Sequence, residues 1–216
     1  MNYSANMGFR KKSIYIFLMI ISFTFLFATC KKGGECISNA YSLKETWSIF
    51  PQKDSINVGD SLFFISSFSN HPFDYNSNIN IDFSGNASVG TSFAVRAVKG
   101  YNELKDAVDS FDFFTISGRL EANSIAPKRT KDLYWLEENN QYSVKFGMIA
   151  KKKGDYSFTT TNALGKLNNQ TACESGAGIF LTCSNIYNNA YLFYLYYGRP
   201  FIPKDDSAHI FCIRVK

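Results

Sequence analysis

The sequence predicts an all-β protein, built as an antiparallel β-sandwich with long loops. Of the 216 residues, 45% are hydrophobic and 19% are charged, a globular composition that excludes a disordered or collagen-like chain. Aromatic residues make up 17% of the chain, led by 21 Phe and 13 Tyr, and such rings favour the half-buried surfaces of strands. The segments that alternate apolar and polar residues lack the 3.6-residue period of a long amphipathic helix, so a helix bundle is disfavoured.

Residues 1–29 have the pattern of an export signal. A basic cluster at Arg10–Lys12 precedes an uncharged run from Ser13 to Phe27 that is rich in Ile, Phe and Leu. The run is about 15 residues long, short of the roughly 20 that a helix needs to cross a bilayer. We therefore expect a signal peptide that is cleaved, with a permanent transmembrane anchor as the alternative.

The segment Phe27-Ala28-Thr29-Cys30 resembles the lipobox of bacterial lipoproteins, although Phe27 and Thr29 depart from its usual residues. Together with the Lys31–Glu35 segment that follows, it resembles lipoproteins of the Bacteroidota. The resemblance implies that Cys30 is acylated, for example with palmitate, and anchors the chain in the cell envelope, at the outer membrane. Several acyl chains on one Cys give stable anchoring. The periplasmic and surface faces both stay open, and an ordinary signal peptide with Cys30 in a disulfide is the alternative.

This organisation divides the chain into a signal peptide at 1–29, a lipidated tether at 30–40 and a sandwich domain at 41–216. The formal charge of +5 falls when the signal is removed, because the three basic residues of 1–29 leave 20 basic against 18 acidic residues. A nearly neutral domain lacks the basic surface that phosphate binding demands, so nucleic acid is not an expected partner.

The clearest strand pattern lies between Asp54 and Ser66. Apolar runs flank Gly59-Asp60 and predict two strands joined by a tight turn, because Gly accepts positive φ and Asp can bond its own backbone. Pro51 before them indicates an edge position, since it donates no ladder hydrogen bond. This stretch is similar to the opening of many immunoglobulin-like modules in exported bacterial proteins, which implies an immunoglobulin-like sandwich.

Further strand candidates combine β-forming residues with alternation and are separated by Asn-, Gly- or Pro-bearing loops. They are residues 79–83, 92–98, 111–117, 141–150, 155–160, 177–183, 191–197 and 208–215. A short helical turn is expected over Glu103–Val108. The step Gly154-Asp155-Tyr156 resembles the tyrosine corner of immunoglobulin-like sandwiches, with an ordinary hairpin turn as the alternative.

Without Cys30, an even number of cysteines remains in a chain that enters an oxidising compartment. We expect two disulfides, for which three connectivities are open, among Cys36, Cys173, Cys183 and Cys212. At least one bridge is expected to tie a terminus to the distal half of the chain. The alternative is a zinc site, which the absence of a Cys-x-x-Cys pair disfavours.

The sequence offers no catalytic constellation. His71 lies in a turn and His209 on a strand face, and both are expected to be structural. The adjacent acids Glu137-Glu138 and Asp205-Asp206 point to opposite sides of an extended chain, so neither pair could act on one sugar, and we expect solvated loop acids. Nucleotide-binding, hydrolase and zinc-protease motifs are absent. We expect no catalytic residue, no metal and no cofactor.

Two kinds of surface site are candidates. Aromatic rings could stack on a sugar or contact a protein partner, and the candidates are Trp135 with its neighbour Tyr134, Tyr191, Tyr194 and Tyr196. An Asp-Ser-aliphatic pattern resembles the O-glycosylation site of exported Bacteroidota proteins, which implies glycan at Ser55, Ser61 and Ser207.

These observations predict a lipid-anchored cell-envelope protein that serves as a non-catalytic binding or structural module. Its expected partners are the membrane, through the lipid, and an envelope protein or glycan. The first alternative is a carbohydrate-binding accessory lipoprotein of a glycan-uptake system. The second is an envelope enzyme such as a glycosidase, which a cleft with two or more acids of perturbed pKa would favour.

Overall fold

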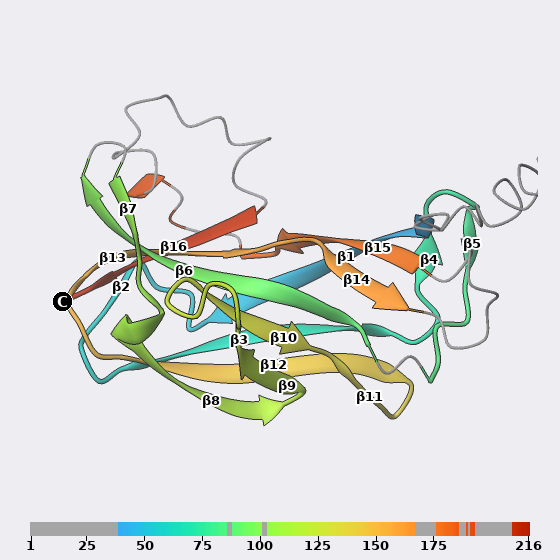
Figure 1. Cartoon of the computed structure of the whole chain (residues 1–216), viewed down its shortest axis with the longest axis horizontal. Coiled ribbons are helices and arrows are strands. Elements are labelled where there is room, and N and C mark those ends of the chain that lie inside the picture. The colour runs from blue at the N-terminus through green and yellow to red at the C-terminus, as the bar shows by residue number, and fades with distance from the viewer. Residues whose placement is uncertain are drawn as a thin grey trace, which may run out of the picture. The chain divides into compact units, whose positions relative to one another are not determined.

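The computed structural model describes residues 39–85, 88–100, 103–166, 176–185, 189, 191–192 and 209–216. They belong to one compact unit, Ile37–Lys216. The unit is an all-β sandwich, so the predicted fold class is confirmed (Figure 1). Among the described residues, no helix has the length and apolar character needed to span a membrane.

The strands vary from two to twelve residues, and a short 3₁₀ turn, η1, precedes β8. They are β1 (Asn39–Phe50), β2 (Ser55–Ile56), β3 (Ser61–Ser69), β4 (Phe73–Asp74), β5 (Ile79–Asn80), β6 (Gly90–Gly100), β7 (Glu103–Asp106), η1 (Val108–Ser110), β8 (Phe111–Ser117), β9 (Arg119–Ala122), β10 (Thr130–Tyr134), β11 (Leu136–Glu138), β12 (Gln141–Ala150), β13 (Gly154–Thr160), β14 (Ala163–Lys166), β15 (Gly176–Cys183) and β16 (Ile210–Val215).

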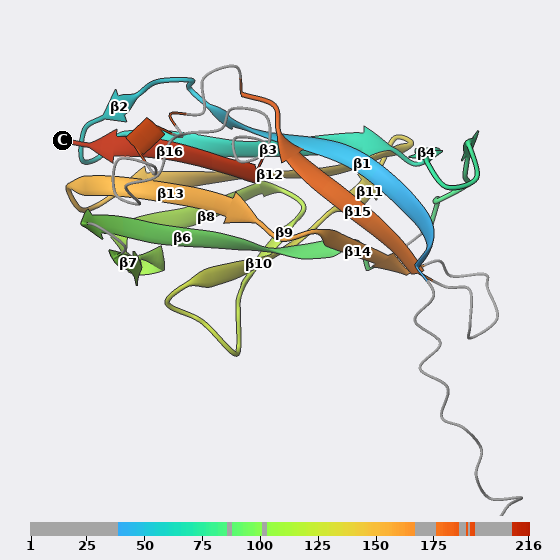
Figure 2. The ribbon, with the colours of Figure 1, turned by 90° about the horizontal axis from the view of Figure 1, so that it is seen from above.

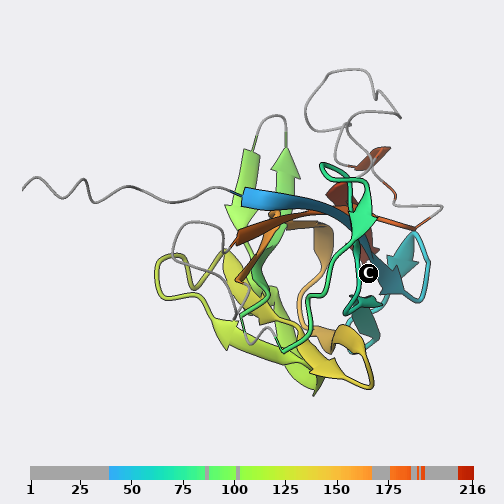
Figure 3. The same cartoon turned by 90° about the vertical axis from the view of Figure 1, so that its right-hand side faces the viewer.

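The strands form two layers that face each other across the core (Figures 1 and 3), and Figure 2 looks onto the layer that contains β6, β13 and β16. The first layer contains β3, β8, β11 and β12. The second contains β6, β7, β9, β10, β13, β14, β15, β16 and β2. Most neighbours are antiparallel, as predicted, but β1 runs parallel to β15 and β16 runs parallel to β2. These two pairs correct the expectation of a wholly antiparallel sandwich.

At both edges of the sandwich the polypeptide chain passes from one layer into the other. On one side β1 pairs with β15 up to Trp47 and then with β3 from Ser48 to Phe50. On the other side β8 pairs with β12 in the first layer, and after Gly118 the chain continues as β9, which pairs with β10 in the second. The strand pairing therefore runs around the core almost as it does in a barrel.

Gly118 makes the second crossing sterically feasible. Its φ is +75°, in the left-handed region that favours glycine. A Cβ atom there would lie 2.8 Å from the carbonyl oxygen of Tyr134 and 2.8 Å from Cγ2 of Val144. The close approach of three strands at this point leaves no room for a side chain.

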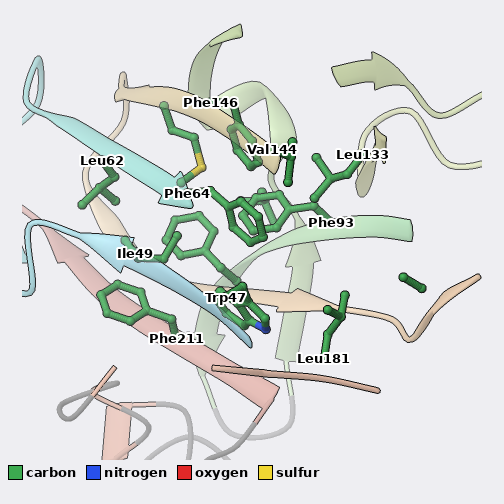
Figure 4. Packing of buried hydrophobic residues seen from close by; sticks show 14 of the residues in the cluster. Trp47, Ile49, Leu62, Phe64, Phe93, Leu133, Val144, Phe146, Leu181 and Phe211 are labelled. Atoms are coloured by element: carbon green, nitrogen blue, oxygen red, sulfur yellow. The ribbon is translucent and has the colours of Figure 1, made fainter. Parts of the chain in front are cut away.

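Aromatic rings fill the space between the layers (Figure 4). Phe64 stacks on Trp47 at 5.4 Å and on Phe146 at 4.9 Å between ring centroids. Phe93 from the second layer meets Phe64 and Phe146 edge to face. Full burial of one such side chain contributes about 1.5–3 kcal/mol, so these four rings are a substantial part of the core. The aromatic composition therefore reflects packing between two sheets.

Several local predictions are confirmed. The strands at 111–117 and 141–150 occur with the predicted bounds. The Gly59-Asp60 turn forms between β2 and β3, with Gly59 at φ +92°. The Tyr156 hydroxyl donates to the carbonyl of Lys152 at 2.9 Å, which is the hydrogen bond of a tyrosine corner.

The helical turn expected over Glu103–Val108 is wrong. Residues 103–106 form β7, which pairs antiparallel with β6, and the helical turn begins only at Val108. Three apolar residues with helical spacing are too few to outweigh a hairpin with the long strand β6. Pro51 lies just beyond the end of β1, where no ladder hydrogen bond is required of it.

Candidate functional site

A hollow of about 390 Å³ opens on the outer face of the second layer, where β6, β10 and β14 lie side by side. Strand register places Tyr134, Gly90 and Leu164 in one row across these strands. Because Gly90 has no side chain, the Tyr134 ring leans over it, and a Cβ atom on Gly90 would lie 2.9 Å from that ring. The space is lined by Ser88, Gly90, Thr91, Ser92, Asp132, Tyr134, Thr161, Asn162 and Leu164. We call it the Tyr134 hollow.

Much of the remaining lining is polar and ordered by hydrogen bonds. Asp132 Oδ1 accepts from Ser92 Oγ at 3.0 Å and from Asn123 Nδ2 at 2.8 Å. Thr91 Oγ1 donates to the carbonyl of Thr161 at 2.7 Å, which fixes the segment after β13 against β6. The second oxygen of Asp132 accepts no hydrogen bond from the described residues, so the hollow offers a positioned carboxylate acceptor.

The ring wall is held from the neighbouring strand. The Arg119 guanidinium on β9 lies 4.3 Å from the centroid of the Tyr134 ring, a cation–π contact. Across β6 from the Tyr134 ring, Leu164 is 61% exposed and forms an apolar wall. The hollow thus combines an aromatic and an aliphatic wall with an acceptor carboxylate, hydroxyls and the Asn162 amide. Such a set binds a ligand with apolar faces and hydroxyl edges.

Alternation along β10 explains which of the predicted rings reaches this site. Leu133 and Trp135 point into the core, whereas Asp132 and Tyr134 point outward. Trp135 is 1% exposed, and its indole nitrogen donates to Ser66 Oγ at 3.3 Å. The prediction that Trp135 stacks on a ligand is therefore wrong, because its ring lies between the layers.

The other predicted rings lie apart from this pattern. Tyr191 is 50% exposed, next to the buried Leu192, and both residues are helical, which corrects the strand expected there over 191–197. Tyr194 and Tyr196 lie outside the described residues. The alternation of residues 132–135 and the position of Gly90 could have indicated part of the hollow from the sequence. The aliphatic wall could not be foreseen in this way, because Leu164 lies about 30 residues further along the chain.

The glycosylation candidates Ser55 and Ser61 are half-buried, at β2 and at the start of β3. Ser207 lies outside the described residues, as do Cys30, Cys36 and Cys173. Glycosylation, lipidation and the disulfides stay predictions.

Cys183 and Cys212 are the two described cysteines, and no disulfide joins one to the other. Cys183 Sγ donates to Asn185 Oδ1 at 3.3 Å. Burial raises the pKa of the Cys183 thiol to about 11, so the thiol form is favoured. Among the described residues, no group of three or more His, Cys, Asp or Glu side chains could hold a metal ion.

The histidines and the acids contact their neighbours locally. His71 Nδ1 lies 2.7 Å from Asn70 Oδ1, and His209 Nδ1 lies 3.1 Å from the carbonyl of Leu181. Glu137, predicted to be a solvated loop acid, instead lies half-buried in β11 and accepts from Asn70 Nδ2 at 2.8 Å. This hydrogen bond, with that from the Gly85 amide, lowers the pKa of Glu137. Asp205 and Asp206 lie outside the described residues.

No protein family model and no curated protein matches the sequence. Among solved structures, the chain is similar to a cohesin module of a family 33 glycoside hydrolase from Clostridium perfringens, with 12% identity, a TM-score of 0.33, and coverage of 64% of this chain and 98% of that module. It is similar to the reeler domain of human F-spondin, with 8% identity, a TM-score of 0.35, and coverage of 70% and 94%. It is also similar to a type II cohesin domain from the cellulosome of Acetivibrio cellulolyticus, with 8% identity, a TM-score of 0.29, and coverage of 63% and 92%. Likenesses this distant assign no ligand, partner or activity to the chain.

Proposed function

We propose that this chain is a lipid-anchored cell-envelope protein that acts as a non-catalytic binding module, and that the Tyr134 hollow takes a short carbohydrate. The observation that carries the proposal is the joining of a ring wall and a positioned carboxylate in one hollow of about 390 Å³. A sugar has apolar C–H faces, which pack against an aromatic ring, and hydroxyl edges, which form hydrogen bonds with polar groups such as a carboxylate. The proposal selects the carbohydrate-binding alternative among the functions expected from the sequence.

The polar groups suit pairs of hydroxyls. The uncommitted oxygen of Asp132 can accept from one hydroxyl, while the Asn162 amide can donate to the next and accept from it. Because Ser92 and Asn123 hold the carboxylate in place, little side-chain entropy is lost when a ligand binds. Preorganisation of this kind favours recognition by a small number of contacts.

The lining of the Tyr134 hollow supports a role in binding without catalysis. Most glycosidases place two carboxyl groups about 5–9.5 Å apart across the scissile bond. In the described lining of the hollow, Asp132 is the single carboxyl group. We therefore propose that Asp132 acts as a hydrogen-bond acceptor for the ligand.

The test is an oligosaccharide array probed with the purified protein, followed by titration of the bound glycans. Asp132→Ala should weaken binding by about 10- to 100-fold, since hydrogen bonds to charged groups contribute about 1.5–3 kcal/mol. Asp112→Ala is the matched control, because Asp112 is exposed on β8 and pairs with Lys151 at 2.7 Å. An array without bound glycan would reject a carbohydrate ligand, and glycans held equally by both variants would reject the hollow as their site.

The anchor is tested separately. Lipidation at Cys30 predicts that the full chain is recovered with membranes, that Cys30→Ser releases it, and that intact mass shows the acyl groups. The same mass measurement reports glycan at Ser55, Ser61 or Ser207. A chain that keeps residues 1–29 in purified cells would contradict the proposed processing.

A further inference from the structure

The hairpin of β4 and β5 presents an aromatic surface to solvent. Phe73 is 41% exposed, Tyr75 49% and Ile79 56%. The Phe73 and Tyr75 rings meet edge to face, with centroids 5.1 Å apart. The ammonium of Lys44 lies 4.2 Å from the centroid of the Tyr75 ring. Exposing such a group of apolar side chains to water is unfavourable, and exposed apolar patches often mark a contact with a protein or a membrane.

The hairpin keeps its carboxylate away from this surface. Asp74 is fully buried and accepts from the backbone amides of Ser42, Asn76 and Ser77 and from the Ser77 hydroxyl. Burial alone would raise the pKa of Asp74, but these hydrogen bonds lower it below its ordinary value. The exposed residues of the turn, Asn76, Ser77 and Asn78, carry no charge. The next acid along the chain is Asp82, which lies beside His71.

The hairpin lies against the first residues of β1 (Figures 1 and 2). The Tyr75 amide donates to the carbonyl of Ser42 at 2.9 Å, and the Ser42 amide donates to Asp74 Oδ1 at 2.6 Å. Cys30 precedes Asn39, the first residue of β1, by nine residues, which can span at most about 32 Å. A lipid on Cys30 would therefore keep this end of the sandwich near the bilayer surface.

We propose that the β4–β5 hairpin rests on the lipid surface, with Phe73, Tyr75 and Ile79 at the level of the lipid headgroups and Lys44 toward their phosphates. Aromatic rings with polar tips and lysine side chains favour this interfacial region. The proposal rests on the lipid anchor at Cys30, and it adds an orientation: the β4–β5 end of the sandwich faces the membrane.

The experiment places a tryptophan in the hairpin of the full lipidated chain. Phe73→Trp is reconstituted into vesicles of phosphatidylcholine brominated near the headgroup, and its emission is compared with that in unbrominated vesicles. The matched control is Phe114→Trp, because Phe114 is 40% exposed, against 41% for Phe73, but lies on the outer face of β8. The native Trp47 and Trp135 are both buried and give a common background that the unsubstituted chain measures.

The proposal predicts that bromine quenches most of the emission added by Phe73→Trp and leaves that of Phe114→Trp unchanged. Flotation of the same vesicles reports the anchor independently. Protein that floats with the vesicles while the tryptophan at 73 stays unquenched would overturn the hairpin contact and leave the anchor intact. Equal quenching of both variants would also overturn the stated orientation. Protein that fails to float would overturn the anchor and, with it, the proposal.

Discussion

Replacing Gly118 by alanine should destabilise the fold much more than replacing Gly59, although both residues have positive φ. An L-residue in the left-handed region costs about 1–2 kcal/mol, which both variants share. At Gly118 the new Cβ would also lie 2.8 Å from Val144 Cγ2 and from the carbonyl oxygen of Tyr134. Such overpacking costs typically about 1–3 kcal/mol more. At Gly59 no atom lies within 4 Å of the added Cβ.

We therefore expect Gly118→Ala to lower the free energy of unfolding by about 2–5 kcal/mol and Gly59→Ala by about 1–2 kcal/mol. Guanidinium unfolding, monitored through the emission of the buried Trp47 and Trp135, measures both variants against the unsubstituted protein. A stability of about 5–15 kcal/mol, usual for a domain, leaves both variants foldable in most of this range. Equal losses in the two variants would refute the steric account of the crossing between β8 and β9.

Two further predictions concern single side chains. Tyr156→Phe removes the hydroxyl that donates to the Lys152 carbonyl at 2.9 Å and should cost about 1 kcal/mol in denaturant unfolding, whereas Tyr75→Phe, on the exposed hairpin, should cost nothing measurable. No measurable loss for Tyr156→Phe would mean that the tyrosine corner adds no stability. Burial raises the pKa of Glu45 from 4.5 to about 7, so the folded state holds a proton that the unfolded state releases, and the free energy of unfolding should fall as pH rises through this interval. Glu45→Gln should flatten that dependence, and identical pH profiles for the two proteins would contradict the assignment.

The sequence predicts individual strands better than it predicts their partners. The strands at 111–117 and 141–150 occur with the expected bounds, because strict alternation records which face is buried. The parallel pairing of β1 with β15 joins residues about 137 positions apart, and no local sequence pattern predicts it. The sheet change within β1 has no turn residue to mark it, since the strand is continuous from Asn39 to Phe50.

The same limit applies to the candidate site. The residues of the Tyr134 hollow come from β6, β10 and the segment around β14, and each piece taken alone is an ordinary strand or loop. Aromatic content alone made both Trp135 and Tyr134 candidates, whereas of the two only Tyr134 lines the hollow. Which of two adjacent rings faces outward depends on the phase of the alternation. That phase is fixed by Leu133 in the core, and it becomes certain only when the opposing layer is known.

The change of partners along β1 has a mechanical consequence. Hydrogen bonds between strands lie across the strand direction, so a load pulling on Asn39 along β1 strains its bonds to β15 and then those to β3 in shear. Bonds loaded in shear must break together, whereas those of a strand peeled from an edge break one after another. A module held at this end against flow or against a bulky ligand would thus transmit the pull into both sheets at once.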